Sequence, residues 1–74
     1  MQKGDICYIA QASAPSLKEH AKYLRRGLPL VCPCVYKRTE KMIITDVLGK
    51  FCLVSPVDDK SKLTIVATDD LILA

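Results

Sequence analysis

Four apolar runs in the second half of the chain limit its fold more than any other feature. In chain order they are Lys41 to Val47, Phe51 to Val57, Leu63 to Ala67 and the short Leu71 to Leu73. Runs of this length, rich in β-branched residues and separated by Gly, Pro, Asp and Ser, predict strands of an antiparallel meander rather than helices. A further run, Ile6 to Ala10, follows Gly4-Asp5 and predicts one more strand near the start.

The segment between the first strand and the meander contains one helix signal. Ser16 and Glu19 have the S-x-x-E spacing of a capping box, in which both side chains satisfy free amides at a helix start. Gly27 and Pro29 predict its end. Apolar residues recur on one side of this predicted helix, at Leu17, Ala21, Leu24 and Leu28. The pattern predicts a short helix whose apolar stripe packs against the sheet.

Composition limits the remaining choices. The 74 residues are 50% hydrophobic, which is too apolar for a disordered chain, and we expect one domain over residues 1–74. With no Trp and one Phe, the core must be aliphatic. Pro33 makes the apolar segment from 30 to 36 an edge strand or an extended connection, because proline cannot donate to a strand ladder. No stretch is long enough to span a bilayer and no signal peptide is visible, so a cytoplasmic protein without membrane contact is expected.

The order of predicted elements resembles the SH3-like barrel, in which a long first loop precedes a meander and a one-turn helix precedes the last strand. The expected fold is therefore mainly β with one helix: a small antiparallel SH3-like barrel with the helix inserted after the first strand. Lys3-Gly4-Asp5-Ile6 is also similar to the start of KOW modules and of PemK-like ribonuclease toxins. Arg26-Gly27-Leu28-Pro29 matches the arginine and proline of the toxins only loosely, and the chain is short for that enzyme, so no catalytic residues are carried over.

Charge suggests an anionic partner. The net charge is +3, and nine of the eleven Lys and Arg residues precede residue 51, against four acids there. The candidate nucleic-acid-binding residues are Lys18, Lys22, Arg25 and Arg26 of the predicted helix and Lys37, Arg38 and Lys41 of the following turn. Binding of phosphates by these residues is also what the KOW resemblance implies. The alternative interpretation is that they form a solvated helix face and a solvated turn.

A second functional hypothesis comes from the alternation of the strands. If Asp5, Lys50 and Lys62 point to solvent, several apolar residues point outward with them, and the candidate protein-interface residues are Ile9, Val54 and Val66. The helix, a second copy of the chain in a homodimer or another protein would then cover this face. The chain would be a protein-binding accessory or inhibitory protein, of the kind that phages and plasmids encode.

No enzymatic or metal-binding motif emerges. Cys7 and Cys52 each stand alone in an apolar strand, and Cys32-Pro33-Cys34 lacks the C-x₂-C spacing typical of zinc sites. Free cysteine behaves as a small hydrophobe, so we interpret the cysteines as structural and expect no metal and no cofactor. His20 has no nucleophile or carboxylate predicted beside it. We therefore expect a binding module rather than an enzyme.

Overall fold

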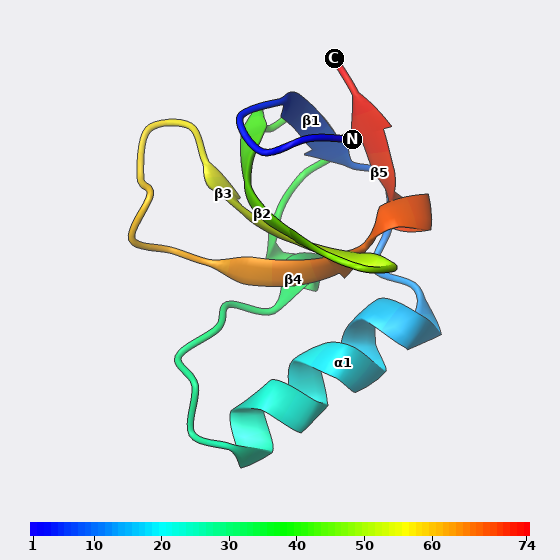
Figure 1. Cartoon of the computed structure of the whole chain (residues 1–74), viewed down its shortest axis with the longest axis vertical. Coiled ribbons are helices and arrows are strands. Elements are labelled where there is room, and N and C mark those ends of the chain that lie inside the picture. Colours follow the sequence, from blue (N-terminus) through cyan, green and yellow to red (C-terminus); the bar gives the residue numbers. More distant parts are fainter.

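The structure, a computed structural model that describes residues 1–74, contains one five-stranded antiparallel sheet and one α-helix (Figure 1). The strands are β1 (Ile6–Ile9), β2 (Met42–Leu48), β3 (Phe51–Pro56), β4 (Thr64–Ala67) and β5 (Leu71–Leu73). Helix α1 (Ala14–Arg25) lies between β1 and β2, as predicted. Two single-turn 3-10 helices, η1 (Pro33–Val35) and η2 (Thr68–Asp70), precede β2 and β5.

The strand order in the sheet is β4-β3-β2-β1-β5. Strands β2, β3 and β4 form the meander, and β5 returns to pair with β1 after the one-turn helix η2. This arrangement confirms the mainly β class with an inserted helix and is consistent with an SH3-like fold in general. No pairing joins β4 to β5, so the sheet remains open and the predicted small barrel is not confirmed.

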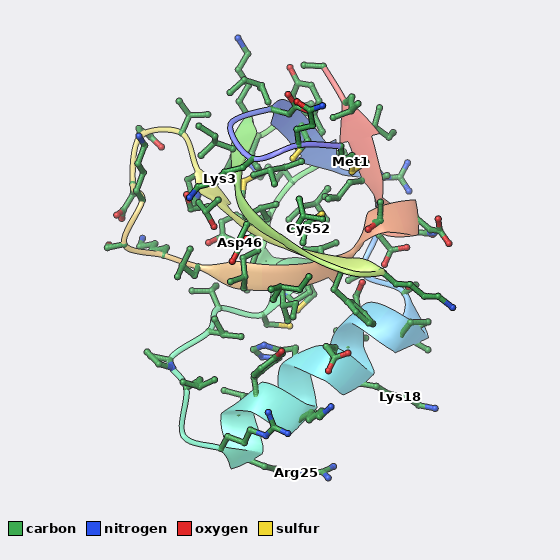
Figure 2. The ribbon with its side chains drawn as sticks, in the orientation of Figure 1. Met1, Lys3, Lys18, Arg25, Asp46 and Cys52 are labelled. Carbon is green, nitrogen blue, oxygen red and sulfur yellow. The ribbon has the colours of Figure 1, made fainter.

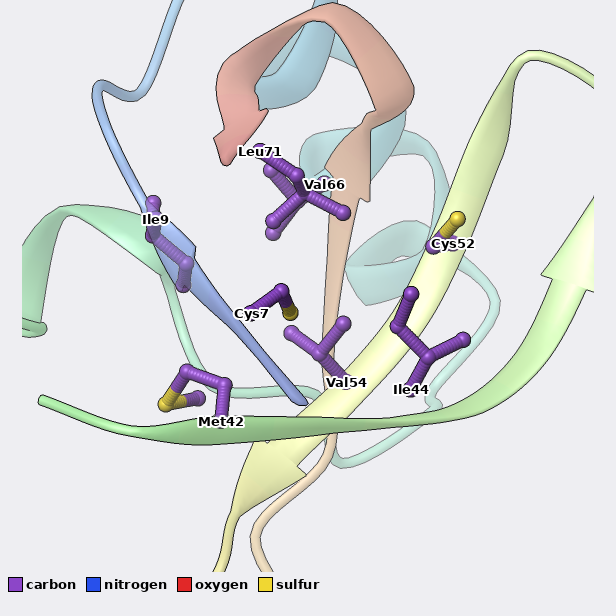
Figure 3. Close-up of a cluster of buried hydrophobic side chains, with 8 residues drawn as sticks. All are labelled: Cys7, Ile9, Met42, Ile44, Cys52, Val54, Val66 and Leu71. Carbon is purple, nitrogen blue, oxygen red and sulfur yellow. The ribbon is translucent and has the colours of Figure 1, made fainter. Parts of the chain in front are cut away.

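The core lies on the concave side of the curved sheet and is aliphatic, as the composition predicted. Figure 3 shows its eight side chains, which converge from all five strands: Cys7, Ile9, Met42, Ile44, Cys52, Val54, Val66 and Leu71. The prediction that Ile9, Val54 and Val66 point outward is therefore wrong. Each is at most 2% exposed, so none of them belongs to a surface interface.

The physical reason for that error is the position of the charged residues used to set the alternation. Asp5, Lys50 and Lys62 all lie in connections outside the strands, where period-2 alternation does not hold. Lys50 belongs to the two-residue turn between Leu48 and Phe51, and Gly49 in that turn has φ +63°. Counting from these three residues inverted the inner and outer faces of the strands.

On the outer side of the sheet, α1 packs against the edge strand β4 (Figure 1). Of the predicted stripe of Leu17, Ala21, Leu24 and Leu28, the three leucines are exposed and only Ala21 is partly buried. The helix instead buries Ser16 and His20 against the sheet. No helix in the structure has the length and apolar character needed to cross a membrane.

The predicted capping box at the helix start is also wrong. The helix begins at Ala14 with Ser13 as its N-cap, and Pro15 occupies the first turn, where a missing amide proton costs nothing. Residues 30–32 form an extended connection, one of the two predicted alternatives, but Pro33–Val35 form the 3-10 helix η1 instead. The Val31 amide donates to the Leu63 carbonyl, 2.8 Å away, which ties this connection to the start of β4.

Candidate nucleic-acid interface

Helix α1 is held on the sheet by the buried carboxylate of Asp70. Its Oδ2 accepts hydrogen bonds from the Ser13 amide at 3.0 Å and from the Ser13 and Ser16 hydroxyls, both at 2.5 Å. Its Oδ1 accepts one from Gln11 Nε2 at 3.2 Å. Ser16 Oγ in turn accepts the Ala67 amide at 2.7 Å. These bonds connect the start of α1 to η2 and β4, so they set the orientation of the helix on the sheet.

The Asp70 side chain is charged although it is buried and has no cation beside it. Burial opposes ionisation and is the largest single influence on its pKa, but the hydrogen bonds from Ser13, Ser16 and Gln11 together outweigh it. The pKa of Asp70 therefore lies below its ordinary value. The positive end of the helix dipole at Ser13 favours the same charge.

Because its pKa is lowered by folding, Asp70 should stabilise the fold in a pH-dependent way. The stabilisation is complete above the unfolded-state pKa of about 3.9 and is lost as the pH falls through that value toward the lower folded-state pKa. We expect the difference in free energy of unfolding between wild type and Asp70→Asn to be largest at pH 7 and clearly smaller near pH 3. Urea denaturation of both proteins at the two pH values measures it. An equal difference at both values would contradict a stabilising role of the ionised carboxylate.

The outward face of α1 carries the first group of predicted binding residues. A helix turns about 100° per residue, so Lys18, Lys22 and Arg25 share the side opposite to Ser16 and His20. All three are exposed, and Figure 2 shows Lys18 and Arg25 extending from the helix away from the sheet. We call these three residues the basic helix face.

Most of the positive charge on the basic helix face has no acidic partner. Lys22 Nζ lies 3.7 Å from Glu19 Oε1, and the one other ion pair joins Lys62 to Asp59. Arg26, on the flank of the helix, stacks over the Tyr23 ring at 5.7 Å from its centre. Lys22 and Arg25 lie in the last turn, where the helix dipole favours cations, so they also stabilise the helix itself. Lys18 and Arg25 have no acidic partner and are free to contact an anion.

The second predicted group does not join the first. Lys37, Arg38 and Lys41 are exposed, but the segment that carries them runs behind the sheet from η1 to the start of β2 (Figure 1). The start of β2 lies at the end of the molecule opposite to α1. The sequence places these residues after the helix but carries no signal for this separation, which depends on the path of the connection.

Sequence reasoning missed an apolar groove on the outer side of the molecule. It has a volume of about 270 Å³ and lies between the end of α1, the connection that follows it and the outer faces of β2 and β3. Its apolar lining comes from Tyr23, Leu28, Pro29, Leu30, Leu48, Leu53 and Leu63. Leu28 and Leu48, which are both exposed, are the residues from which this groove could have been predicted. Helical spacing instead predicted that Leu28 belongs to the apolar stripe that packs against the sheet.

The structure brings together no three metal-ligating side chains. Cys7 and Cys52 are buried in the core, and burial raises the pKa of Cys7 to about 11. His20 is buried against the sheet, and its Nδ1 has no hydrogen-bond partner. No family model, curated protein or solved structure matches this chain.

Proposed function

We propose that this chain is a non-enzymatic binding module that contacts nucleic-acid phosphates through the basic helix face. The observation that supports the proposal is the placement of Lys18, Lys22 and Arg25 on one exposed side of a helix fixed to the sheet by Asp70. Lys18 and Arg25 are seven residues apart, about 10 Å along the helix axis. This span corresponds to about three nucleotides at 3.4 Å per step in one strand of duplex DNA.

The positions of the tyrosines favour phosphate contacts over base reading. Tyr8, Tyr23 and Tyr36 are all half-buried, and the hydroxyl of Tyr36 lies inside the protein. Sequence-tolerant binding of single strands uses exposed aromatic side chains on which bases stack. We therefore expect binding that depends on charge and salt and depends little on nucleotide sequence.

The resemblance of Lys3-Gly4-Asp5-Ile6 to the start of KOW modules supports the same proposal, whereas the PemK resemblance would add a ribonuclease activity that we do not propose. One fold of this kind carries many functions, so the proposal rests on the helix face rather than on the fold. Lys37, Arg38 and Lys41 would form a separate contact on a longer nucleic acid. A cytoplasmic location would give the protein access to such partners.

The test compares salt dependence between two charge-matched variants. We expect wild type to bind labelled duplex or single strand at 50 mM salt and to lose affinity steeply by 200 mM. The triple variant Lys18→Ala/Lys22→Ala/Arg25→Ala should lower the slope of log affinity against log salt by about one unit for each lost phosphate contact. Alanine suits a helix, so the fold should persist, which circular dichroism checks. Fluorescence anisotropy at a series of salt concentrations measures the slope.

The matched control is Lys3→Ala/Lys50→Ala/Lys60→Ala, which removes three exposed lysines elsewhere and changes net charge equally. Figure 2 shows Lys3 on the other side of the sheet from Lys18 and Arg25. The control should leave the salt slope unchanged. Equal losses in both variants would show attraction to the whole surface rather than binding at the helix, and no binding at 50 mM salt would refute the proposal.

The apolar groove favours a second candidate function, protein binding by an accessory or inhibitory module. Leu28 and Leu48 border the groove and are 43% and 40% exposed, and Leu24 of α1 is 50% exposed. Clustered exposed leucines of this kind are typical of sites that dock an apolar segment of a partner or of a second copy. Failure of nucleic-acid binding at low salt would leave this candidate as the better one.

A further inference from the structure

Two of the four cysteines are arranged differently from the structural pair in the core. The sulfur atoms of Cys32 and Cys34 lie 2.7 Å apart, and both are reduced. Cys34 is exposed and Cys32 is half-buried, whereas Cys7 and Cys52 are fully buried. A disulfide needs its sulfurs at about 2.05 Å, so the two sulfur atoms of this pair already lie close to bonding distance.

The backbone around the pair is held in place. Pro33, between the two cysteines, is fully buried and begins η1, which packs against β4. The Val35 amide donates to the Cys32 carbonyl at 3.3 Å, and the Val31 amide donates to Leu63 at 2.8 Å. These contacts keep the two thiols facing each other at the surface.

A groove of about 270 Å³ lies beside the exposed thiol. Cys34, Tyr36 and Arg38 line it together with residues of the chain after β1, among them Ala10 and Gln11. Arg38 adds a permanent positive charge to this groove. A thiol and a guanidinium in one groove suit a small anionic molecule that carries a disulfide.

We propose that Cys32 and Cys34 form a thiol–disulfide exchange site for anionic low-molecular-weight disulfides. The thiolate of Cys34 attacks one sulfur of the small disulfide, which releases one small thiol and leaves a mixed disulfide on Cys34. The Cys32 thiolate then attacks the Cys34 sulfur, closes the protein disulfide and releases the second small thiol. The protein loses two electrons and two protons, and the small disulfide gains both. Disulfides that form in a reducing cytoplasm are usually transient ones of this type.

The rate of this exchange should depend on pH. The hydrogen bond between the two thiols is the main cause that raises the pKa of Cys34 above its ordinary value. The raised pKa keeps the thiolate fraction of Cys34 small at neutral pH. Because the thiolate is the attacking species, the exchange should accelerate as the pH rises toward 9.

Oxidised glutathione serves as the probe, because it is an anionic disulfide. The reduced full chain is incubated with it at pH 8, remaining thiols are alkylated, and the protein is digested with trypsin. Cleavage after Arg26 and Lys37 gives one peptide, residues 27–37, that contains Cys32 and Cys34 and no other cysteine. We expect this peptide to become lighter by two hydrogen atoms and to resist alkylation, while the peptides with Cys7 and Cys52 are alkylated after unfolding.

Single variants test the two-step mechanism. Cys32→Ser should stop at a stable glutathione adduct on Cys34, because no second thiol resolves it. Arg38→Ala should slow oxidation by glutathione disulfide several-fold and leave oxidation by an uncharged disulfide, hydroxyethyl disulfide, unchanged, with Lys37→Ala as its charge-matched control. Wild type that keeps a stable mixed disulfide, leaves all four thiols free or oxidises Cys7 and Cys52 at the same rate would overturn the proposal.

Discussion

Asp70→Ala should lower the free energy of unfolding by about 3 kcal/mol, because the buried Ser16 hydroxyl and the partly buried hydroxyl and amide of Ser13 would lose their acceptor. The affected donors are the Ser13 amide and hydroxyl and the Ser16 hydroxyl, and Gln11 loses its contact as well. For a domain of this size the loss corresponds to a fall in Tm of about 15 °C. Thermal and urea denaturation measure it.

The matched control for this prediction is Asp69→Ala. Asp69 lies in the same 3-10 helix η2 and carries the same charge, but its side chain is exposed. We expect this variant to change stability by about 0.5 kcal/mol at most. If both variants were equally stable, the carboxylate of Asp70 would not hold α1 on the sheet, and the orientation of the basic helix face would need another explanation.

Val54→Asp should unfold the protein under conditions in which wild type is folded. Val54 is fully buried in β3 and pairs with Ile44 on one side and Thr64 on the other. A carboxylate there would lie in the apolar core without a partner, at an expected cost of at least 4 kcal/mol. This approaches the whole stability of a small domain, about 4–11 kcal/mol for a chain of this length. Circular dichroism and the urea midpoint report the loss.

The same variant distinguishes the buried Val54 of the structure from the outward Val54 that the strand alternation predicted. An outward Val54, as the sequence interpretation had it, would accept aspartate with little loss of stability and would lose only partner binding. Val57→Asp is the control, because Val57 follows β3 directly and is 42% exposed. We expect it to fold like wild type. A folded Val54→Asp variant with an unchanged urea midpoint would contradict the burial of Val54.

Local signals located the elements of this fold because each depends on neighbouring residues. Turn residues between short apolar runs marked the strands of the meander, and the run from 63 to 67 became β4 with a shift of one residue at its start. Gly27 has φ +81° just after α1, and its amide donates to the Leu24 carbonyl, as expected of a helix end. The short β5 follows a one-turn helix, which confirms the order taken from the SH3-like resemblance.

The faces of these elements depended on contacts between distant parts of the chain. The helix turned Ser16 rather than Leu17 toward the sheet, because Asp70, 54 residues further on, accepts the Ser16 hydroxyl. A capping pattern read from residues 16 to 19 cannot include that acceptor. The same limit applied to the strands, where turn residues gave no information about which alternate side chains meet in the core.

For the candidate site, the amino-acid sequence by itself determined which cations lie together on α1, since helical spacing is a local property. Only the tertiary structure decided that Lys37, Arg38 and Lys41 lie apart from them, because the path of residues 30–41 follows from the packing of η1 against β4. It also decided that Cys7 and Cys52 are buried while Cys32 and Cys34 remain reachable. The sequence lists four similar thiols, and burial, which arises from long-range packing, makes them chemically different.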